Sequence, residues 1–222
     1  MNNLQINYDV SQNQYPPSIS IKRVDNLEDL DHVCYLRYKT YSKYLPGFAE
    51  KLKSPEDADY ENNIVLLLKE KETGIPLATI RIHTNLNRPL PLQSVVTLPD
   101  LMRNSVMSEA VRFCVSSEIN VQKRNFARNL LLKAYFKLCI ANKIEWIVIT
   151  ARKPVNKIYT RLLFDDISPN GEFVRLPYVN DIPHRIMRIR VDTVKSLWDR
   201  MNHPLFDFFF NTTHPDLDVM RI

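Results

Sequence analysis

Two charged side chains interrupt an apolar stretch in the middle of the chain. In the segment Ser108–Val115 (SEAVRFCV), Glu109 and Arg112 stand three positions apart among alanine, valine, phenylalanine and cysteine. Successive side chains of a strand point to opposite faces, so these two groups share a face only if a β-bulge intervenes. Buried charges cost free energy unless they are paired, and a positioned carboxylate is a candidate general base. We therefore expect an irregular strand that carries a polar site.

A basic segment follows this strand. The stretch Gln122–Leu132 (QKRNFARNLLL) predicts a loop that turns into a helix from about residue 125 to 142. Free N–H groups and the dipole at a helix N-terminus favour an anion, and Lys123, Arg124 and Arg128 add positive charge there. Both a phosphate site and an ordinary solvated helix face are consistent with this pattern.

The apolar periodicity predicts the elements that hold these two segments. Alternating or continuous apolar runs indicate strands, and apolar residues at helical spacing indicate helices. We expect strands at residues 18–24, 64–70, 76–83, 107–116, 145–151 and 184–192, helices at 26–44, 125–142, 155–163 and 192–201, an acidic loop at 46–61 and a hairpin-like region at 165–178. This order predicts a mixed α/β fold around a single sheet.

The domain organisation follows from composition along the chain. A polar stretch rich in Asn and Gln, with Pro16–Pro17, predicts a mobile leader over residues 1–17. We expect one domain over residues 18–192, and a C-terminal helix and aromatic tail packed on it over residues 193–222. The cluster Phe206–Phe210 in this tail is interpreted as core or interface packing.

Composition argues against several classes of protein. Three glycines are too few for a P-loop or a dinucleotide-binding loop. Three widely spaced cysteines predict neither a disulfide scaffold nor a metal site, and they favour a reducing, cytoplasmic location. No apolar run reaches the roughly 20 residues of a spanning helix. The net charge of +5 suits an acidic partner, but the basic residues lack the interleaved aromatics typical of nucleic-acid binding.

The segment after the strand at 145–151 resembles the GNAT acyltransferase superfamily. Asn156 is followed by Tyr159 and by the pair Leu163–Phe164, where the superfamily carries a Gly–Phe pair. The superfamily binds the pyrophosphate of its acyl-pantetheine donor on a (Gln/Arg)-x-x-Gly-x-(Gly/Ala) loop. Gln122–Ala127 is similar, with asparagine in place of the first glycine. Asparagine tolerates left-handed backbone, so this replacement is mild.

A second resemblance covers about residues 20–165. It is to the acyl-homoserine lactone synthases and the related N-acyl amino acid synthases, both variants of the GNAT fold. Their most specific element, Glu-x-x-Arg-Phe-x-Val on the fourth strand, matches Glu109–Val115. The other matched positions are Arg37, Tyr41, Asp57 or Asp59, and Arg81. The resemblance implies a central twisted mixed sheet flanked by helices, with a splayed fourth strand. Lactone synthases carry a tryptophan after the first helix where this chain has Phe48, which leaves S-adenosylmethionine use in question.

These families imply roles for the matched residues. Glu109 is expected to act as general base, Tyr159 to donate a proton or hydrogen bond to the departing thiolate, and backbone N–H groups near Cys114–Ser116 to bind the oxyanion. We interpret His83 and the Cys114 thiol as structural. The acceptor pocket or structural ion network is expected from Arg37, Tyr41, Asp57, Asp59, Arg81, Arg112 and Phe113 together with Glu109. Acyl-pantetheine binding is expected from Cys114, Val115, Ser116, Gln122, Lys123, Arg124, Asn125, Ala127 and Asn156.

The function implied is transfer of a fatty acyl group from a thioester to the amine of an amino acid or related molecule. The donor is expected to be acyl carrier protein, which is acidic and suits a basic surface formed by Lys123, Arg124, Arg128 and Lys133; acyl-CoA is the other possibility. No tightly bound cofactor and no metal are expected. One alternative is an acyl-homoserine lactone synthase that uses S-adenosylmethionine. The other is a non-catalytic module that binds acylated carrier protein.

Overall fold

The computed structural model describes residues 19–61, 63–168 and 170–217. Its strands form one sheet in the order β1-β2-β3-β4-β5-β8-β6, with β7 also paired to β8. Only β4 and β5 are parallel; the other pairs are antiparallel. The strands are β1 Ile19–Arg23, β2 Ile64–Glu70, β3 Pro76–Thr84, β4 Met107–Val115, β5 Trp146–Ala151, β6 Asp165–Asp166, β7 Phe173–Arg175 and β8 Pro183–Arg190. The predicted mixed α/β fold with a single sheet is confirmed, while the predicted leader, residues 1–17, lies outside the described residues.

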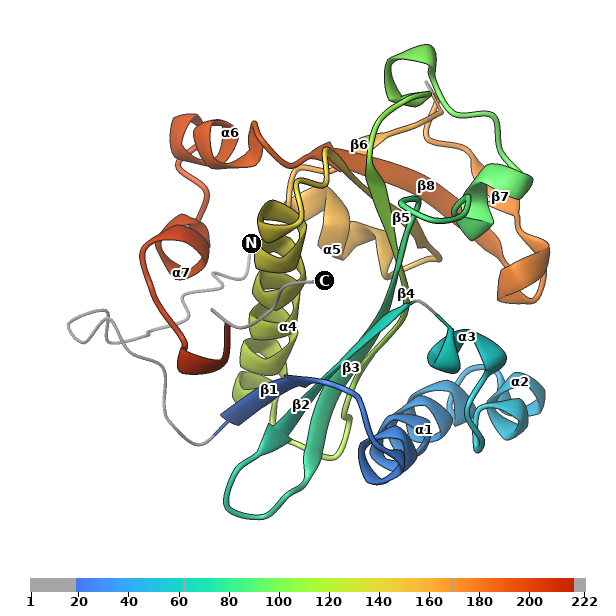
Figure 1. Cartoon of the computed structure of the whole chain (residues 1–222), viewed down its shortest axis with the longest axis vertical. Coiled ribbons are helices and arrows are strands. Elements are labelled where there is room, and N and C mark those ends of the chain that lie inside the picture. Colours follow the sequence, from blue (N-terminus) through green and yellow to red (C-terminus); the bar gives the residue numbers. More distant parts are fainter. Residues whose placement is uncertain (1–18, 62, 169, 218–222) are drawn as a thin grey trace.

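Helices cover both faces of this sheet (Figure 1). Helix α4 crosses one face, with α6 and α7 beside it, and α1, α2 and α3 lie together on the other side. The helices are α1 Leu27–Ser42, α2 Pro46–Lys51, α3 Asp57–Tyr60, α4 Val121–Ala141, α5 Asn156–Arg161, α6 Val194–Arg200 and α7 Phe206–Phe210, with 3-10 turns η1 Pro91–Ser94, η2 Asp100–Met102, η3 Pro177–Val179 and η4 Pro215–Leu217.

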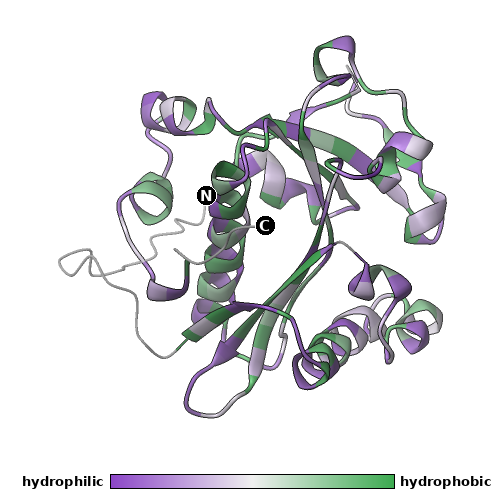
Figure 2. Ribbon diagram, in the orientation of Figure 1, coloured by the Kyte–Doolittle hydropathy of each residue, from purple (hydrophilic) through white to green (hydrophobic). Residues whose placement is uncertain are grey.

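The main core fills the space between the sheet and α4. Alternate residues of β2 and β3, such as Leu66 and Ile80, and α4 residues such as Leu130 are fully buried in it, and hydrophobic residues follow the strands accordingly (Figure 2). Two rings of the C-terminal segment extend this core: Phe209 lies edge-on against Phe136 of α4 and against Trp198 of α6. Burial of this apolar surface supplies most of the driving force for the fold.

Three local predictions are wrong. The expected acidic loop at 46–61 contains the two short helices α2 and α3. The region 165–178 is not a hairpin, because β6 and β7 each pair with β8 rather than with one another. The expected loop at the start of α4 is already helical from Val121, where the Asn120 side chain caps the helix by accepting from the Lys123 N–H.

Strand β4 is bulged and leaves its neighbour halfway along. It pairs with β5 only from Met107 to Ala110, and then continues along β3 alone. Between Val111 and Cys114 the register with β3 shifts, so that β4 carries one residue more than β3. Arg112 adopts a left-handed backbone there, with φ of 54°. This confirms the irregular, splayed fourth strand and opens a wedge between the C-terminal halves of β4 and β5.

Candidate active site

The bulge decides which way Arg112 points. Ser108, four residues earlier on β4, faces α4 and forms a hydrogen bond with the Tyr135 hydroxyl at 2.7 Å. In a regular strand Arg112 would face α4 as well, because side chains alternate. The extra residue instead turns its guanidinium to the opposite face, where it donates to both Glu56 carboxylate oxygens at 2.8 and 2.7 Å. Glu109 faces that side too, because its carboxylate accepts a hydrogen bond from the Leu92 N–H of η1.

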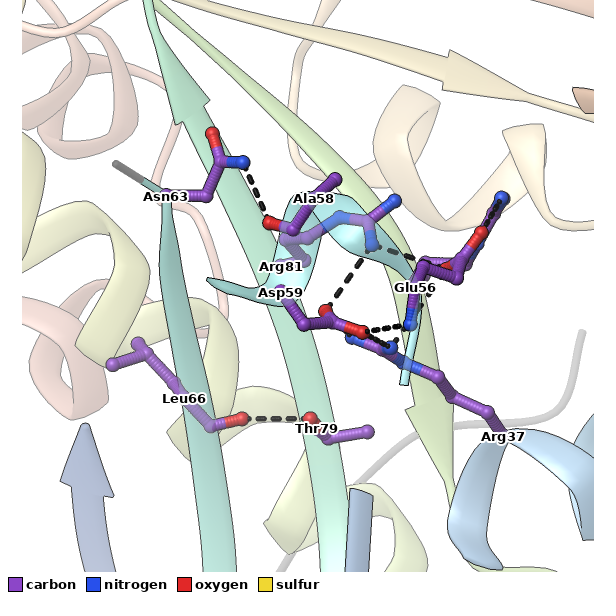
Figure 3. Close-up of polar contacts among 9 residues, drawn as sticks. Arg37, Glu56, Ala58, Asp59, Asn63, Leu66, Thr79 and Arg81 are labelled. Carbon is purple, nitrogen blue, oxygen red and sulfur yellow. Dashed lines mark hydrogen bonds and ion pairs between the residues drawn. The ribbon is translucent and has the colours of Figure 1, made fainter. Parts of the chain in front are cut away.

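Three guanidinium groups and two carboxylates form a compact network on this face (Figure 3). Arg37 of α1 donates to both oxygens of Asp59, at 2.6 and 2.9 Å. Arg81 of β3 bridges the carboxylates, at 3.0 Å from Glu56 and 3.1 Å from Asp59. Two-pronged contacts of this kind fix orientation as well as charge. The network therefore ties α1, α3, β3 and the bulge of β4 into one wall.

The acids in this network are held ionised. Burial opposes ionisation, but the hydrogen bonds from Arg112 and Arg37 outweigh it, so the pKa values of Glu56 and Asp59 lie below their ordinary values. The membership of the network differs from the prediction in one carboxylate. Glu56 takes the place expected for Asp57, which is exposed and lies outside the network. The Asp59 side chain also accepts from the Glu56 N–H at 2.9 Å and so closes the single turn of α3.

Glu109 lies outside this network, which is a second correction. Its side chain is fully buried, and it accepts from the Leu92 N–H at 3.0 Å and from the Tyr178 hydroxyl at 2.8 Å. Neither partner carries a charge, so burial dominates and raises the pKa of Glu109 to about 7. A carboxyl with this pKa exchanges a proton readily near neutral pH, as a general base requires.

His83 lies directly across from Glu109 in the β3–β4 ladder. It is buried, and its Nδ1 has no hydrogen-bond partner among the described residues. Burial, reinforced by the charge of Arg81, lowers the pKa of His83 to about 3. The imidazole is therefore neutral at physiological pH and a much weaker base than Glu109.

On the other side of the bulge, aromatic residues and Cys114 line the wedge. Tyr41 of α1 lies edge-on to Phe48 at 5.4 Å, and the Arg112 guanidinium lies over the same Phe48 ring at 4.9 Å. Burial raises the pKa of Tyr41 to about 12 and that of the Cys114 thiol to about 11. Both groups are therefore protonated at neutral pH, and a protonated thiol is a poor nucleophile. Phe113 is the exception among the predicted residues, since it packs into the core under α4 rather than on this face.

Tyr159 and Asn156 are the two buried residues of α5. Burial, followed by the nearby Tyr41 hydroxyl, raises the pKa of Tyr159, so the two phenols lie near each other. The buried Asn156 Oδ1 has no hydrogen-bond partner among the described residues. The Ser116 N–H donates to the Leu77 carbonyl at 2.8 Å and is unavailable to an oxyanion, which corrects that part of the prediction. Because ladder groups alternate along a strand, the Val115 N–H points toward the wedge.

An apolar cavity lies behind the wedge, between β5 and α4. Tyr159 lines it together with side chains from β4, α4, β5, β8, α6 and α7, and its volume of ≈30 Å³ has room for about two water molecules. The lining residues are Ala110, Leu132, Tyr135, Phe136, Ile147, Ile149, Tyr159, Leu162, Phe164, Ile189, Val194, Trp198 and Phe209. An alkyl chain could enter here only if some of these side chains moved apart.

The basic start of α4 differs from the prediction in three ways. Asn125 is helical rather than left-handed, because it is absent from the positions with positive φ. Lys123 pairs with Glu70 of β2, and Arg124 donates to the Ile119 carbonyl at 3.0 Å, so both side chains already have partners. Lys133 is fully buried and donates to backbone carbonyls of the C-terminal segment, so it is not part of a basic surface. Gln122 and Ala127 lie in the first turns of the helix, exposed and buried respectively.

Leu163 explains why the superfamily places glycine at this position. It lies directly after Leu162, the C-cap of α5, with a left-handed φ of 62°. The Phe164 N–H donates to the Tyr159 carbonyl and the Leu163 N–H to the Thr160 carbonyl, which together form a Schellman cap. A side chain in this conformation costs roughly 1 kcal/mol or more.

Sequence reasoning missed two partners that shape the site, Glu56 and Tyr178. Glu56 carried a usable signal, because it lies three residues before Asp59, the spacing of a capping box. Tyr178 carried none, since it reaches Glu109 from a turn 69 residues further along the chain. Among the described residues, no helix is long and apolar enough to cross a membrane, and no three His, Cys, Asp or Glu side chains are grouped to bind a metal.

Comparison with known proteins gives matches in structure only. No protein-family model and no curated protein sequence matches the chain. FeeM, an N-acyl amino acid synthase from uncultured soil microbes, aligns with a TM-score of 0.63 at 16% identity, over 86% of this chain and 97% of FeeM. The acyl-homoserine lactone synthase LasI aligns with a TM-score of 0.56 at 17% identity, over 78% of this chain and 89% of LasI.

A third similar structure is BjaI, a CoA-dependent acyl-homoserine lactone synthase solved with SAM and isopentyl-CoA. It aligns with a TM-score of 0.57 at 16% identity, over 90% of this chain and 96% of BjaI. A putative N-acetyltransferase from Lactobacillus plantarum also aligns, with a TM-score of 0.51 at 13% identity, over 78% of this chain and 99% of that protein. The chain therefore has the GNAT acyltransferase fold, in the variant shared by N-acyl amino acid synthases and acyl-homoserine lactone synthases.

Proposed function

We propose that this protein is an N-acyltransferase that moves a fatty acyl group from a thioester to the amine of an amino acid or related small molecule. The observation that carries the proposal is the desolvated Glu109, which has a pKa of about 7 and lies on β4 three residues before the bulge at which the strand leaves β5. A proton acceptor of this kind beside an open wedge is what amine acylation needs.

The reaction forms one bond and breaks one bond at the thioester carbonyl. The neutral amine nitrogen attacks the carbonyl carbon, and Glu109 takes the proton that the nitrogen loses. The Val115 N–H stabilises the negative charge that develops on the carbonyl oxygen. When the C–S bond breaks, the sulfur takes a proton from the Tyr159 hydroxyl, and that proton is replaced from solvent. The products are an N-acyl amide and a free thiol.

The acyl-thioester donor is proposed to lie in the wedge between β4 and β5. The Asn156 Oδ1, which is buried without a protein partner, supplies an acceptor for an amide N–H of the pantetheine arm. The apolar cavity behind Tyr159 offers the alkyl chain a path into the core, once its lining side chains separate. Arg124 and Arg128, both half-buried at the start of α4, add positive charge at the mouth of the wedge, where the donor's phosphate would lie.

The acceptor is proposed to approach from the opposite face, along the wall built by the ion network. FeeM, an N-acyl amino acid synthase, aligns over nearly its whole length, which favours an amino acid. Arg112, Tyr41 and Phe48 form the part of this wall nearest the bulge. In this scheme the network positions the acceptor, and Glu109 performs the chemistry.

The test offers the protein acylated carrier proteins and acyl-CoA thioesters of several chain lengths, each with a mixture of free amino acids. We expect thiol release that depends on the amino acids, together with N-acyl amino acid products detected by mass spectrometry. The relative rates with the two donor classes decide between carrier protein and coenzyme A. Thiol release from neither donor, despite tight binding of acylated carrier protein, would overturn the proposal in favour of a binding module.

Because lactone synthases are among the similar structures, the test needs one further reaction. BjaI was solved with SAM, so S-adenosylmethionine replaces the amino acids in a parallel reaction. We expect no methylthioadenosine, since Phe48 stands where lactone synthases carry a tryptophan. Formation of methylthioadenosine together with an acyl-homoserine lactone would reassign the acceptor.

A further inference from the structure

A second hollow opens beside the site, at the ends of β5 and α1. Its volume is ≈440 Å³, within the range of small-molecule pockets. Most of its wall is apolar or aromatic: Tyr44 and Leu45 from the connection between α1 and α2, Phe173 from β7, and Ile182 and Pro183 at the start of β8. The only charged side chains among the lining residues are Arg152 and Lys153, which directly follow β5.

These two cations lie over aromatic rings and not beside acids. The Arg152 guanidinium is 4.9 Å from the Tyr44 ring centroid, and the Lys153 ammonium is 4.8 Å from that of Phe173. Neither forms an ion pair with a carboxylate within the part of the chain that the structure describes. Cation–π contacts hold such groups in place at a modest gain in free energy. Arg152 Nη1 donates to the Lys153 carbonyl at 3.1 Å, while the other guanidinium N–H groups and the Lys153 ammonium can bind an anion.

The hollow adjoins the proposed catalytic face through the chain between α1 and α2. The N–H groups of Tyr44 and Leu45, which line the hollow, both donate to the Tyr41 carbonyl, and the Phe48 N–H donates to the Leu45 carbonyl, so the hollow is joined directly to the acceptor wall. The buried His184 lies in electrostatic range of both Arg152 and Arg112, because both charges add to burial in lowering its pKa. A ligand in the hollow therefore lies next to the wall that Tyr41 and Phe48 form with Arg112.

We propose that this hollow binds the acceptor, and that Arg152 and Lys153 recognise its carboxylate. The acceptor is then an α-amino acid with a free carboxylate and an apolar side chain, which lies against Leu45, Ile182 and the rings of Tyr44 and Phe173. Amines without an anionic group lack a partner for these two cations and bind weakly. This inference rests on the proposed function, which it deepens by naming the chemical class of the acceptor.

The test compares free amino acids with their primary amides, using the double variant Arg152→Gln/Lys153→Gln. In the wild-type protein we expect the KM of the free acid to be about 10- to 100-fold lower than that of the amide, the range of a charge-assisted hydrogen bond. The double variant should raise the KM of the free acid by a similar factor and leave the KM of the amide and both kcat values nearly unchanged. The control is Lys157→Gln, an exposed lysine on the neighbouring helix α5 that should change neither KM.

The outcomes separate this inference from the proposed function. Equal KM values for acid and amide in the wild-type protein, or an equal rise of both in the double variant, would overturn the carboxylate assignment while acyl transfer itself stands. Absence of thiol release with every acceptor would remove the proposed function, and the acceptor assignment with it. Circular dichroism of the double variant shows whether it keeps the fold before any KM is compared.

Discussion

Two glutamates, Glu56 and Glu109, lie on the same side of the sheet and differ in burial, partners and pKa. The Glu56 side chain is 24% exposed, and Glu109 is fully buried. Glu56 accepts bidentate bonds from Arg112 and a further bond from Arg81, and its pKa is lowered. Glu109 has only the Leu92 N–H and the Tyr178 hydroxyl as partners, and its pKa is raised to about 7. The difference separates a carboxylate that builds the site from one that is suited to transfer a proton.

The comparison also explains why the bulge matters. The bulge turns Arg112 to the face that Glu109 also occupies, and there the guanidinium pairs with Glu56 and not with Glu109. A guanidinium paired directly with Glu109 would stabilise its charged form and lower its pKa. Because Glu56 takes the Arg112 guanidinium, Glu109 keeps only the two uncharged hydrogen-bond donors.

The largest effect is expected for Glu109→Gln. Removing a general base should lower kcat for acyl transfer by about 10²- to 10⁴-fold, because glutamine keeps the shape of the side chain but cannot take the proton. Steady-state kinetics with the preferred donor and acceptor measure this. Glu118→Gln, an exchange at an exposed glutamate, is the control and should leave kcat unchanged. Retention of wild-type kcat in Glu109→Gln would remove this residue from the mechanism.

The same exchange at Glu56 should affect stability instead. Glu56→Gln leaves Arg112 without its buried carboxylate partner, and losing one member of a buried ion pair costs about 3 kcal/mol of unfolding free energy. Urea denaturation followed by circular dichroism measures the loss. Glu50→Gln is the matched control, since its ion pair with Lys53 is exposed and should contribute less than about 1 kcal/mol. An equally small effect at both positions would show that the network is not structural.

Removing the Tyr178 hydroxyl should change the pH dependence of the reaction. The base form of Glu109 becomes populated as pH rises through about 7, so kcat/KM should rise over that range. Tyr178→Phe removes a donor that stabilises the charged carboxylate, so the midpoint should move upward by about one unit. Rate profiles between pH 5 and 9 measure it, with Tyr38→Phe on α1 as the control. A midpoint that moved downward, or not at all, would contradict the assigned role of Tyr178.

The smallest effect is expected at the end of α5. Leu163 adopts a left-handed backbone, so Leu163→Gly should raise the unfolding free energy by about 1 kcal/mol once the greater chain entropy of glycine is allowed for. Leu163→Ala keeps the Cβ atom and should give no such gain. Thermal or urea unfolding of the two variants side by side decides the matter. A less stable glycine variant would mean that the apolar contacts of Leu163 outweigh its backbone strain.

Much of the fold could be predicted from the sequence, because its elements carry strong local patterns. The alternation in β1, the apolar run of β5 and the spacing of Glu109 and Arg112 predicted the sheet and its irregular strand. The match of Glu109–Val115 to a known strand motif predicted where the site would lie. These features depend on periodicity and short motifs, which a single sequence records well.

The partners of each charge could not be predicted in the same way. Arg112 pairs with Glu56 rather than Asp57 because α3 forms a helical turn that was expected to be a loop. Lys133 is buried because the C-terminal segment covers it with carbonyl groups from a distant part of the chain. Such contacts depend on tertiary packing, and local sequence carries little information about them.

The most direct test of the account is the titration of the two glutamates themselves. Carbon-13 NMR of protein labelled at the glutamate carboxyl carbons follows each group without any substrate, and spectra of Glu56→Gln and Glu109→Gln assign the two signals. We predict that Glu109 titrates near pH 7 and that Glu56 titrates below the ordinary range of glutamates. A Glu109 signal that titrates with the exposed glutamates, at about pH 4, would contradict the claim that its environment prepares it to act as a base.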